Sequence, residues 1–303
     1  MSTFPTLTEV KSIEVHEDSI SKILLLPDNR IATCSTDTTI KILDPSNDFH
    51  CDITLKGHTE WVTSICLLAN GNIVSSALDG TFKFWSITKD SYKCLFTIST
   101  GNTKICADKI ISLPNNRFAA AMEEEWSIRV YKTDEPFSET PIATMTGHKD
   151  YIPSIGYVKE RDVIVSASQD ETCRVWKCDT YQCINVIKGF YTGASNSVYV
   201  LDGQRVFIGG GDQLSVIDLE KAAIELQIDD QKLQLICSAV MIKDDIMLIA
   251  SGSGILNLWN MKTNELKQIQ TKHQLSLQDV VKLNENTVLI ATEEFTIDIY
   301  KIE

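Results

Sequence analysis

The sequence predicts an all-β protein built from seven repeated units. Three observations predict it: short runs rich in Ile, Val, Leu, Phe and Tyr alternate at period two, turn residues separate these runs, and a similar run ends in a large residue every 41–46 residues. The helical period is almost absent. The residues that end the seven units are Leu43, Trp85, Tyr131, Trp176, Ile217, Trp259 and Tyr300.

Turn residues divide each unit into short strands. Asn70-Gly71-Asn72 separates two apolar runs, as a hairpin turn should, and Asp202-Gly203 does the same later in the chain. A spacing of roughly 40–45 residues is typical of a four-stranded repeat in a circular array. Seven such units occupy residues 1–303, so the sequence predicts one domain.

Two segments resemble repeats of the WD40 family. Residues 57–85 read GHTEWVTSI…IVSSALDGTFKFW, with a Gly-His pair, a strand Ser, a turn Asp and a terminal Trp, and residues 147–176 carry the same four features. The resemblance implies a seven-bladed WD40-type β-propeller with two hydrogen-bonded structural tetrads. The first would contain His58, Ser75, Asp79 and Trp85, and the second His148, Ser166, Asp170 and Trp176. Such a tetrad would supply partners to an imidazole and a carboxylate that are costly to bury alone.

The other units keep less of this pattern. Blade one has His16, Thr33 and Asp37 but Leu43 in place of Trp, and blade seven has His273, with Glu294 at the Asp position and Tyr300 at the end. Blade three has Asn102 near the His position. Blade five has a glycine run at 209–211 before the turn, and blade six has Ser-Gly-Ser-Gly at 251–254 where the turn Asp would lie. The blade count therefore depends on spacing and strand pattern.

The two ends of the sequence predict how the ring closes. The chain ends on the third strand of blade seven, which leaves that blade without an outer strand, and an extra strand from Val10 to Val15 precedes His16. Placing the N-terminal strand as the outer strand of blade seven pairs both open edges.

Nothing in the pattern indicates an enzyme, a metal site or a cofactor. His58, Ser75 and Asp79 could be read as a hydrolytic triad, but the constellation recurs in blade four, whereas a catalytic triad is expected once, in a cleft. Cys173, Cys178 and Cys183 lack the CxxC spacing of a zinc site, which favours buried thiols. The 209–211 glycines precede no GK[ST] motif, so a phosphate loop is unsupported.

Composition limits the compartment and the partners. The N-terminus lacks a signal-peptide pattern, and no apolar run approaches the roughly 18 residues of a membrane helix, so we expect a cytoplasmic or nuclear protein that does not bind a membrane. The nine scattered cysteines fit free thiols. A net charge of −13 argues against nucleic acid as a direct partner.

One face of the predicted propeller gathers acidic and aromatic residues. The Gly-His loops and the Asp turns share this face, which places the following acids there: Glu17, Asp18, Glu60, Glu123, Glu124, Glu125, Asp150, Glu171, Asp229, Asp230, Glu293 and Glu294. The large residues on the same rim are Trp61, Trp126, Tyr151, Tyr191 and Phe295. This combination predicts an adaptor for a basic peptide or protein surface, contacted by Glu60, Trp61, Glu123, Glu124, Trp126, Tyr151 and Phe295.

Several alternatives stay open. Acidic loops also keep proteins soluble, and Trp61 and Tyr151 could serve local packing alone. A structural subunit of a larger assembly would use the sides and the opposite face, where Arg30, Arg117, Arg161 and Arg205 fall on hairpins. A ubiquitin-ligase substrate receptor is a weaker alternative, based on a faint similarity of Trp259-Asn260-Met261-Lys262 to a WDxR box. The protein alone is expected to be a monomer or a subunit of a complex.

Overall fold

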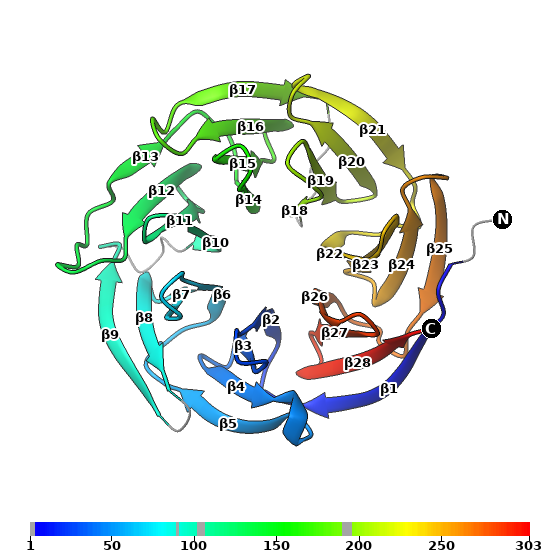
Figure 1. Cartoon of the computed structure of the whole chain (residues 1–303), viewed down its shortest axis with the longest axis horizontal. Coiled ribbons are helices and arrows are strands. Elements are labelled where there is room, and N and C mark those ends of the chain that lie inside the picture. The colour runs from blue at the N-terminus through cyan, green and yellow to red at the C-terminus, as the bar shows by residue number, and fades with distance from the viewer. Residues whose placement is uncertain (1–3, 89–90, 102–106, 190–195) are drawn as a thin grey trace.

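The computed structural model describes residues 4–88, 91–101, 107–189 and 196–303. Twenty-eight strands form seven antiparallel sheets of four strands each, arranged as blades around a common axis (Figure 1). The all-β class and the seven-bladed propeller predicted from the sequence are confirmed. Within the described ranges, no helix is long and apolar enough to cross a bilayer.

In every blade the first strand lies next to the axis and the fourth lies at the outer rim (Figure 1). Blade one comprises β2 (Ile20–Leu25), β3 (Ile31–Ser35), β4 (Ile40–Asp44) and β5 (His50–Leu55), with a 3-10 helix η1 (Pro45–Asn47). Blade two comprises β6 (Val62–Leu67), β7 (Ile73–Ala77), β8 (Thr81–Ile87) and β9 (Tyr92–Ser99). Blade three comprises β10 (Ala107–Leu113), β11 (Arg117–Met122), β12 (Ser127–Lys132) and β13 (Ala143–Met145).

The remaining blades repeat this order. Blade four comprises β14 (Ser154–Val158), β15 (Val163–Ala167), β16 (Thr172–Lys177) and β17 (Cys183–Lys188). Blade five comprises β18 (Asn196–Val200), β19 (Arg205–Gly210), β20 (Gln213–Asp218) and β21 (Ala223–Asp229). Blade six comprises β22 (Ile236–Lys243), β23 (Ile246–Ser251), β24 (Ile255–Asn260) and β25 (Glu265–Gln270). Blade seven comprises β26 (Leu277–Asn284), β27 (Thr287–Thr292), β28 (Thr296–Ile302) and β1 (Leu7–Glu14).

The N-terminal strand closes the ring, as the sequence predicts. β1 pairs antiparallel with β28 from Leu7 opposite Ile302 to Glu14 opposite Thr296. Backbone hydrogen bonds between Thr6 and Glu303, of 3.0 and 2.9 Å, extend the pairing beyond the strand. The strand starts three residues earlier and ends one residue earlier than the predicted span from Val10 to Val15. Closure leaves blade seven with four strands, as in the other six.

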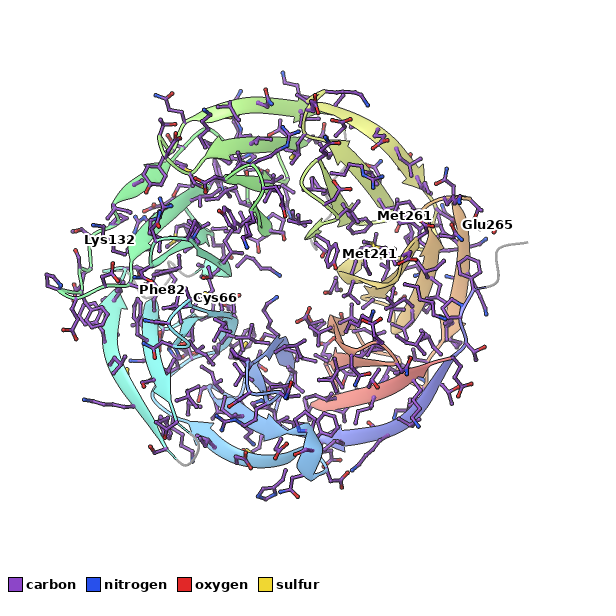
Figure 2. The ribbon with its side chains drawn as sticks, viewed as in Figure 1. Cys66, Phe82, Lys132, Met241, Met261 and Glu265 are labelled. Carbon is purple, nitrogen blue, oxygen red and sulfur yellow. The ribbon has the colours of Figure 1, made fainter. Side chains whose placement is uncertain are left out.

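The cores lie between neighbouring blades. Phe82 and Phe118 form an edge-to-face pair across blades two and three, with ring centroids 5.3 Å apart, and Phe118 stacks on Tyr131 at 5.1 Å. Figure 2 labels Cys66 and Phe82, which belong to this cluster. Each residue that ends a repeat packs against the preceding blade, as Trp85 does against Ala32 and Cys34 of blade one. This contact explains the period of 41–46 residues, because one blade cannot bury its own apolar faces.

Removal of the residues up to Glu14 should destabilise the whole ring. The deletion opens the edge of β28 and exposes Tyr300 and Ile302, which are 4% and 5% exposed in the closed ring. We expect Tm to fall by more than about 5 °C, with aggregation on heating, in calorimetry and light scattering. Val10→Ser is the control, since Val10 is 48% exposed and its change should leave Tm unaltered. A truncated chain with the Tm of the intact protein would show that closure is dispensable.

Candidate functional site

In blade two, a chain of hydrogen bonds joins four side chains from the second strand, the third strand, the turn between them and the loop before the first strand. His58 precedes β6, Ser75 lies on β7, Asp79 lies in the β7–β8 turn and Trp85 lies on β8. His58 Nδ1 lies 2.9 Å from Asp79 Oδ2, and His58 Nε2 lies 2.7 Å from Ser75 Oγ. Trp85 Nε1 donates to Ser75 Oγ at 2.8 Å. The chain of bonds fixes the loop before β6 to the turn after β7.

Blade four contains the same arrangement, with His148, Ser166, Asp170 and Trp176. The distances are 3.0 Å from His148 Nδ1 to Asp170, 2.7 Å from Nε2 to Ser166 Oγ, and 2.9 Å from Trp176 Nε1 to Ser166 Oγ. Burial lowers the pKa of the His148 imidazole, and the adjacent Asp170 carboxylate opposes this shift only in part. The neutral ring is therefore favoured, with Nδ1 donating to the carboxylate and Nε2 accepting from the serine hydroxyl.

Blade one has three of the four groups. His16 Nδ1 lies 2.7 Å from Asp37 Oδ2 and Nε2 lies 2.8 Å from Thr33 Oγ1, whereas Leu43 packs without a polar atom. Asn102, which the sequence places near the His position of blade three, lies outside the described residues.

Blade seven uses a carboxylate that the pattern did not reveal. His273 Nδ1 lies 2.9 Å from Glu294 Oε2, and its Nε2 pairs closely with Asp298, which is 1% exposed. Asp298 also accepts a hydrogen bond of 2.5 Å from Ser12 Oγ on β1. The closing strand is therefore bound to the histidine of blade seven through this one side chain. The signal was an acid in the middle of β28, where blades one to four carry Lys41, Lys83, Arg129 and Arg174.

The acid of the blade-two tetrad is stabilised in its charged form. Burial by itself raises the pKa of Asp79, but hydrogen bonds from the His58 ring and the Thr81 hydroxyl, with the attraction of His58, lower it to about 2. The backbone N–H groups of Thr59 and Thr81 also donate to this carboxylate, at 3.1 and 3.0 Å. The four donors explain why a half-buried carboxylate stays ionised.

The geometry of the His-Ser-Asp groups is unsuited to nucleophilic catalysis. Ser75 and Ser166 are both 0% exposed, and each hydroxyl already accepts from an indole. A substrate carbonyl could not reach either oxygen atom. Burial raises the pKa of the Cys178 thiol to about 12, and Cys173 and Cys178 are free thiols inside the protein. Among the described side chains, no group of three or more His, Cys, Asp or Glu residues could hold a metal ion.

The loops before the first strands and the turns between the second and third strands meet on one side of the ring. Backbone hydrogen bonds of 2.9 Å join Leu78 N to Trp61 O and Gln169 N to Tyr151 O, and one of 3.0 Å joins Glu293 N to Ser276 O. We call this side the loop face. It carries Glu60 and Trp61 before β6, Glu123, Glu124 and Trp126 between β11 and β12, Tyr151 before β14, and Phe295 between β27 and β28.

The loop face exposes large apolar side chains. Trp61 is 52% exposed, Trp126 43% and Phe295 40%, whereas Tyr151 is half-buried. The structure adds Leu235 and Leu275, which are 39% and 48% exposed in the loops before β22 and β26 and which the sequence did not single out. The three glutamates Glu60, Glu123 and Glu124 are exposed beside them. Tyr191 lies outside the described residues.

Trp126 and Phe295 hold the left-handed backbone conformation that this turn also has at Thr38 and Glu171 of blades one and four. The φ angles of Trp126 and Phe295 are +49° and +69°, in the left-handed region. The equivalent turns of blades two and six have glycine there, Gly80 at +74° and Gly254 at +76°. For an aromatic residue this conformation is an outlier, and positive φ values at non-glycine residues cost about 1–3 kcal/mol.

The opposite side of the ring offers fewer free arginines than the sequence suggested. Arg30 of blade one donates to Thr88 O of blade two at 3.4 Å and pairs with Asp28. Arg117 of blade three donates to Cys178 O and Tyr181 Oη of blade four, at 2.9 and 2.8 Å. Arg161 of blade four donates to Gly203 O of blade five at 2.7 Å, and Arg205 pairs with Asp202 in its own hairpin. Three of the four guanidinium groups therefore join neighbouring blades.

The segment that faintly resembles a WDxR box is largely internal. Trp259 is 0% exposed and Asn260 7% exposed, and the Asn260 side chain accepts from the backbone N–H groups of Lys262 and Thr263. In this conformation the indole cannot contact another protein.

Replacement of the tetrad acid should change how stability depends on pH. Because the folded-state pKa of Asp79 is below the unfolded value of about 4, its contribution is present above pH 4 and is lost as the pH falls towards 2. We expect Asp79→Asn to lower the free energy of unfolding at pH 7 by about 1–3 kcal/mol. Between pH 4 and pH 2, the free energy of unfolding should fall less for this variant than for the wild type. Urea unfolding at pH 7, 4 and 3 measures both effects. The exposed Asp52→Asn is the control, and equal acid sensitivity of Asp79→Asn and wild type would contradict the assignment.

Comparison with known proteins agrees with the fold. The family model described as "WD domain, G-beta repeat" matches residues 7–44, 49–86 and 139–177. The chain is 25% identical over 143 residues to the transcriptional corepressor LEUNIG_HOMOLOG of Arabidopsis thaliana, covering 47% of this chain and 17% of that protein. It is 21% identical over 268 residues to Mitochondrial division protein 1 of Pyricularia oryzae, covering 88% and 36%.

A third relative is Pre-mRNA-processing factor 17 of Mus musculus, with 22% identity over 275 residues that cover 83% of this chain and 44% of that protein. The chain thus spans less than half the length of each of these three relatives. The three repeat matches and the closed ring of seven four-stranded blades show that the chain contains WD40 repeats and folds as a seven-bladed β-propeller.

Proposed function

We propose that the chain is a non-catalytic scaffold that binds a basic segment of another protein across the loop face. The observation that carries this proposal is the display of Trp126 and Phe295, which are exposed and also hold left-handed backbone conformations. Because both side chains are exposed, their packing does little to offset the cost of that backbone conformation. A glycine would avoid the conformational cost, as it does at Gly80 and Gly254.

Exposed strain of this kind favours a binding role. Strained residues persist where the surrounding structure imposes them, and they concentrate at functional sites. The hydrogen-bonded β11–β12 and β27–β28 pairs impose the two turns, so the backbone at both aromatic residues is held in place before a partner arrives. A rigid aromatic group loses little conformational entropy on binding, which is why such groups dominate the affinity of many interfaces.

The charge of the loop face favours a basic partner. Glu60 directly precedes Trp61, the exposed Glu123 and Glu124 lie in the same turn as Trp126, and the chain carries a net charge of −13. Apolar anchors within an acidic rim suit a segment in which lysine or arginine alternates with apolar residues. The electrostatic part of such binding weakens as salt rises.

The relatives support a binding role without identifying the partner. Two of their names, a transcriptional corepressor and a pre-mRNA-processing factor, describe roles in gene expression. For this chain we infer action in the cytoplasm or nucleus, as a monomer or as a subunit of a protein complex. Direct contact with nucleic acid is disfavoured by the net charge.

A second candidate is a structural subunit that uses the outer wall of the ring. Ile184 and Val186 on β17 are 44% and 43% exposed, and Tyr92 and Leu95 on β9 are 38% and 37% exposed. These positions would be covered in an assembly that contacts the sides of blades two and four. A complex held by this wall would survive high salt, whereas binding through the loop face would weaken.

Glycine at the two strained positions should separate stability from binding. We expect Trp126→Gly and Phe295→Gly to leave the free energy of unfolding unchanged or to raise it by up to about 1 kcal/mol, because the turn conformation suits glycine. Binding of a fluorescent Lys/Arg-rich peptide with interspersed leucines should weaken at least tenfold for the double variant. Ile142→Gly, at an exposed residue of the β12–β13 connection, is the matched control. Unchanged peptide affinity in the double variant would contradict the proposal.

Charge reversal tests the acidic part of the same face. We expect Glu123→Lys/Glu124→Lys to lose partners that the tagged wild-type protein retains in affinity purification from its own cells at about 0.15 M salt. The control reverses two exposed acids away from this face, Glu139→Lys/Asp179→Lys, with folding checked by circular dichroism. Recovery of the same partners by both variants would place the contact on the outer wall.

A further inference from the structure

The innermost strands carry a ring of equivalent polar residues around the axis. One residue from each first strand contributes: Lys22, Ser64, Lys109, Ser154, Ser197, Ser238 and Asp279. In five blades this residue directly follows a break in strand register, between Ile20 and Lys22, Val62 and Ser64, Ala107 and Lys109, Ile236 and Ser238, and Leu277 and Asp279. Their equivalent positions place these residues at the same level of the ring, on the strands that lie next to the axis in Figure 1.

The serines and the aspartate at this level connect adjacent blades. Ser64 Oγ accepts from Ile110 N at 3.3 Å, Ser154 Oγ from Val198 N at 3.0 Å, and Asp279 Oδ2 from Ile23 N at 2.9 Å. In each case the donor belongs to the next blade. A lysine cannot accept a hydrogen bond, so Lys22 and Lys109 do not serve this role in blades one and three.

The two lysines bring positive charge together inside the ring. The Lys22 and Lys109 side chains repel each other electrostatically, and Lys22 Nζ lies 3.9 Å from Asp279 Oδ2. Asp279 also accepts from Ser238 Oγ at 2.7 Å, so its two oxygen atoms are already bonded. Of the groups described at this level, two ammonium groups therefore share one carboxylate.

The repulsion between these lysines affects their pKa values. The charge of Lys22, followed by burial, lowers the pKa of Lys109 to about 7, and attraction to Asp279 offsets this only in part. Burial also opposes the charge on Lys22, but Asp279 raises its pKa above the ordinary value. The thiols of Cys34 and Cys66 are the other titratable groups close to Lys22, and burial raises the pKa of each to about 12, so they are neutral.

We propose that Lys22 and Lys109 form a binding site for a small phosphate-bearing anion on the axis of the ring. A doubly charged tetrahedral anion offers oxygen atoms to both ammonium groups at once and removes their mutual repulsion. The Lys22 side chain is 21% exposed and Lys109 is half-buried, so solvent and small solutes reach the site. This site is independent of the loop face and of its proposed partner.

Direct titration of the intact protein tests the proposal. We expect sulfate and inorganic phosphate to bind with a stoichiometry of one in isothermal titration calorimetry at constant ionic strength. Sulfate binding should take up protons at pH 7.5, because the anion favours the charged form of Lys109 while sulfate itself does not titrate there. Saturating anion should raise Tm by roughly 2–6 °C relative to chloride. Glycerol 3-phosphate is the third probe, and tighter binding than phosphate would identify a phosphorylated metabolite as the source of the anion.

Variants separate this site from adventitious charge effects. Lys109→Met and Lys22→Met should each weaken anion binding at least tenfold, and Lys109→Met should match or exceed the wild-type Tm in chloride because it removes the repulsion. Lys132→Met is the control, since Lys132 is exposed and lies away from the axis in Figure 2. Absence of saturable binding by the wild type, or equal affinity in Lys109→Met, would overturn the proposal. If Lys109→Met does not fold, Lys109→Gln and the wild-type titration decide the question.

Discussion

Each blade is apolar on both faces of its sheet, and the fold depends on covering those faces with the two neighbouring blades. Adjacent residues of one strand serve the two neighbours, as Phe84 packs towards blade three while Trp85 packs towards blade one. The hydrophobic contribution of a blade therefore exists only within the ring. A ring of this kind has no terminal repeat that could be solvated on one side, so closure is a requirement of the core itself.

This dependence explains which features the sequence could predict. Contacts that recur in every blade leave a periodic signal, and the positions from Leu43 to Tyr300 marked all seven blades, together with the unpaired strand that closes them. Contacts that occur in only one blade leave no periodic signal in the sequence. Asp298 was missed because the pattern places an acid in the turn, at Glu294, whereas the histidine of blade seven also pairs with an acid on the strand. Arg117 and Arg161 resembled surface residues because their partners lie on the next blade, about 40 or more residues away in sequence.

The candidate binding face was predictable in composition but not in conformation. Glu123, Glu124 and Trp126 were recognised as an unusual run, yet the sequence does not state that the tryptophan adopts the backbone conformation of a glycine. That fact follows only from the alignment of the β11–β12 turn with the turns at Gly80 and Gly254 in three dimensions. Lys22 and Lys109 were overlooked for a related reason: a lysine within an alternating strand resembles an outward-facing residue, and the equivalence of the two positions appears only from the strand register. The rigid ring tolerates such local departures because its stability comes from the contacts between blades.

The pairing of β1 with β28 also imposes an order on biosynthesis. Among the strands of the ring, β1 is the first to be synthesised and must wait for its partner β28, the last strand of the ring in sequence. Throughout translation the segment from Leu7 to Glu14 presents an open strand edge, and blade one lacks the neighbour that covers Leu43 and Ile31. The ring therefore remains an open arc until β28 has been synthesised, and its exposure to chaperones is set by the time between the synthesis of β1 and that of β28.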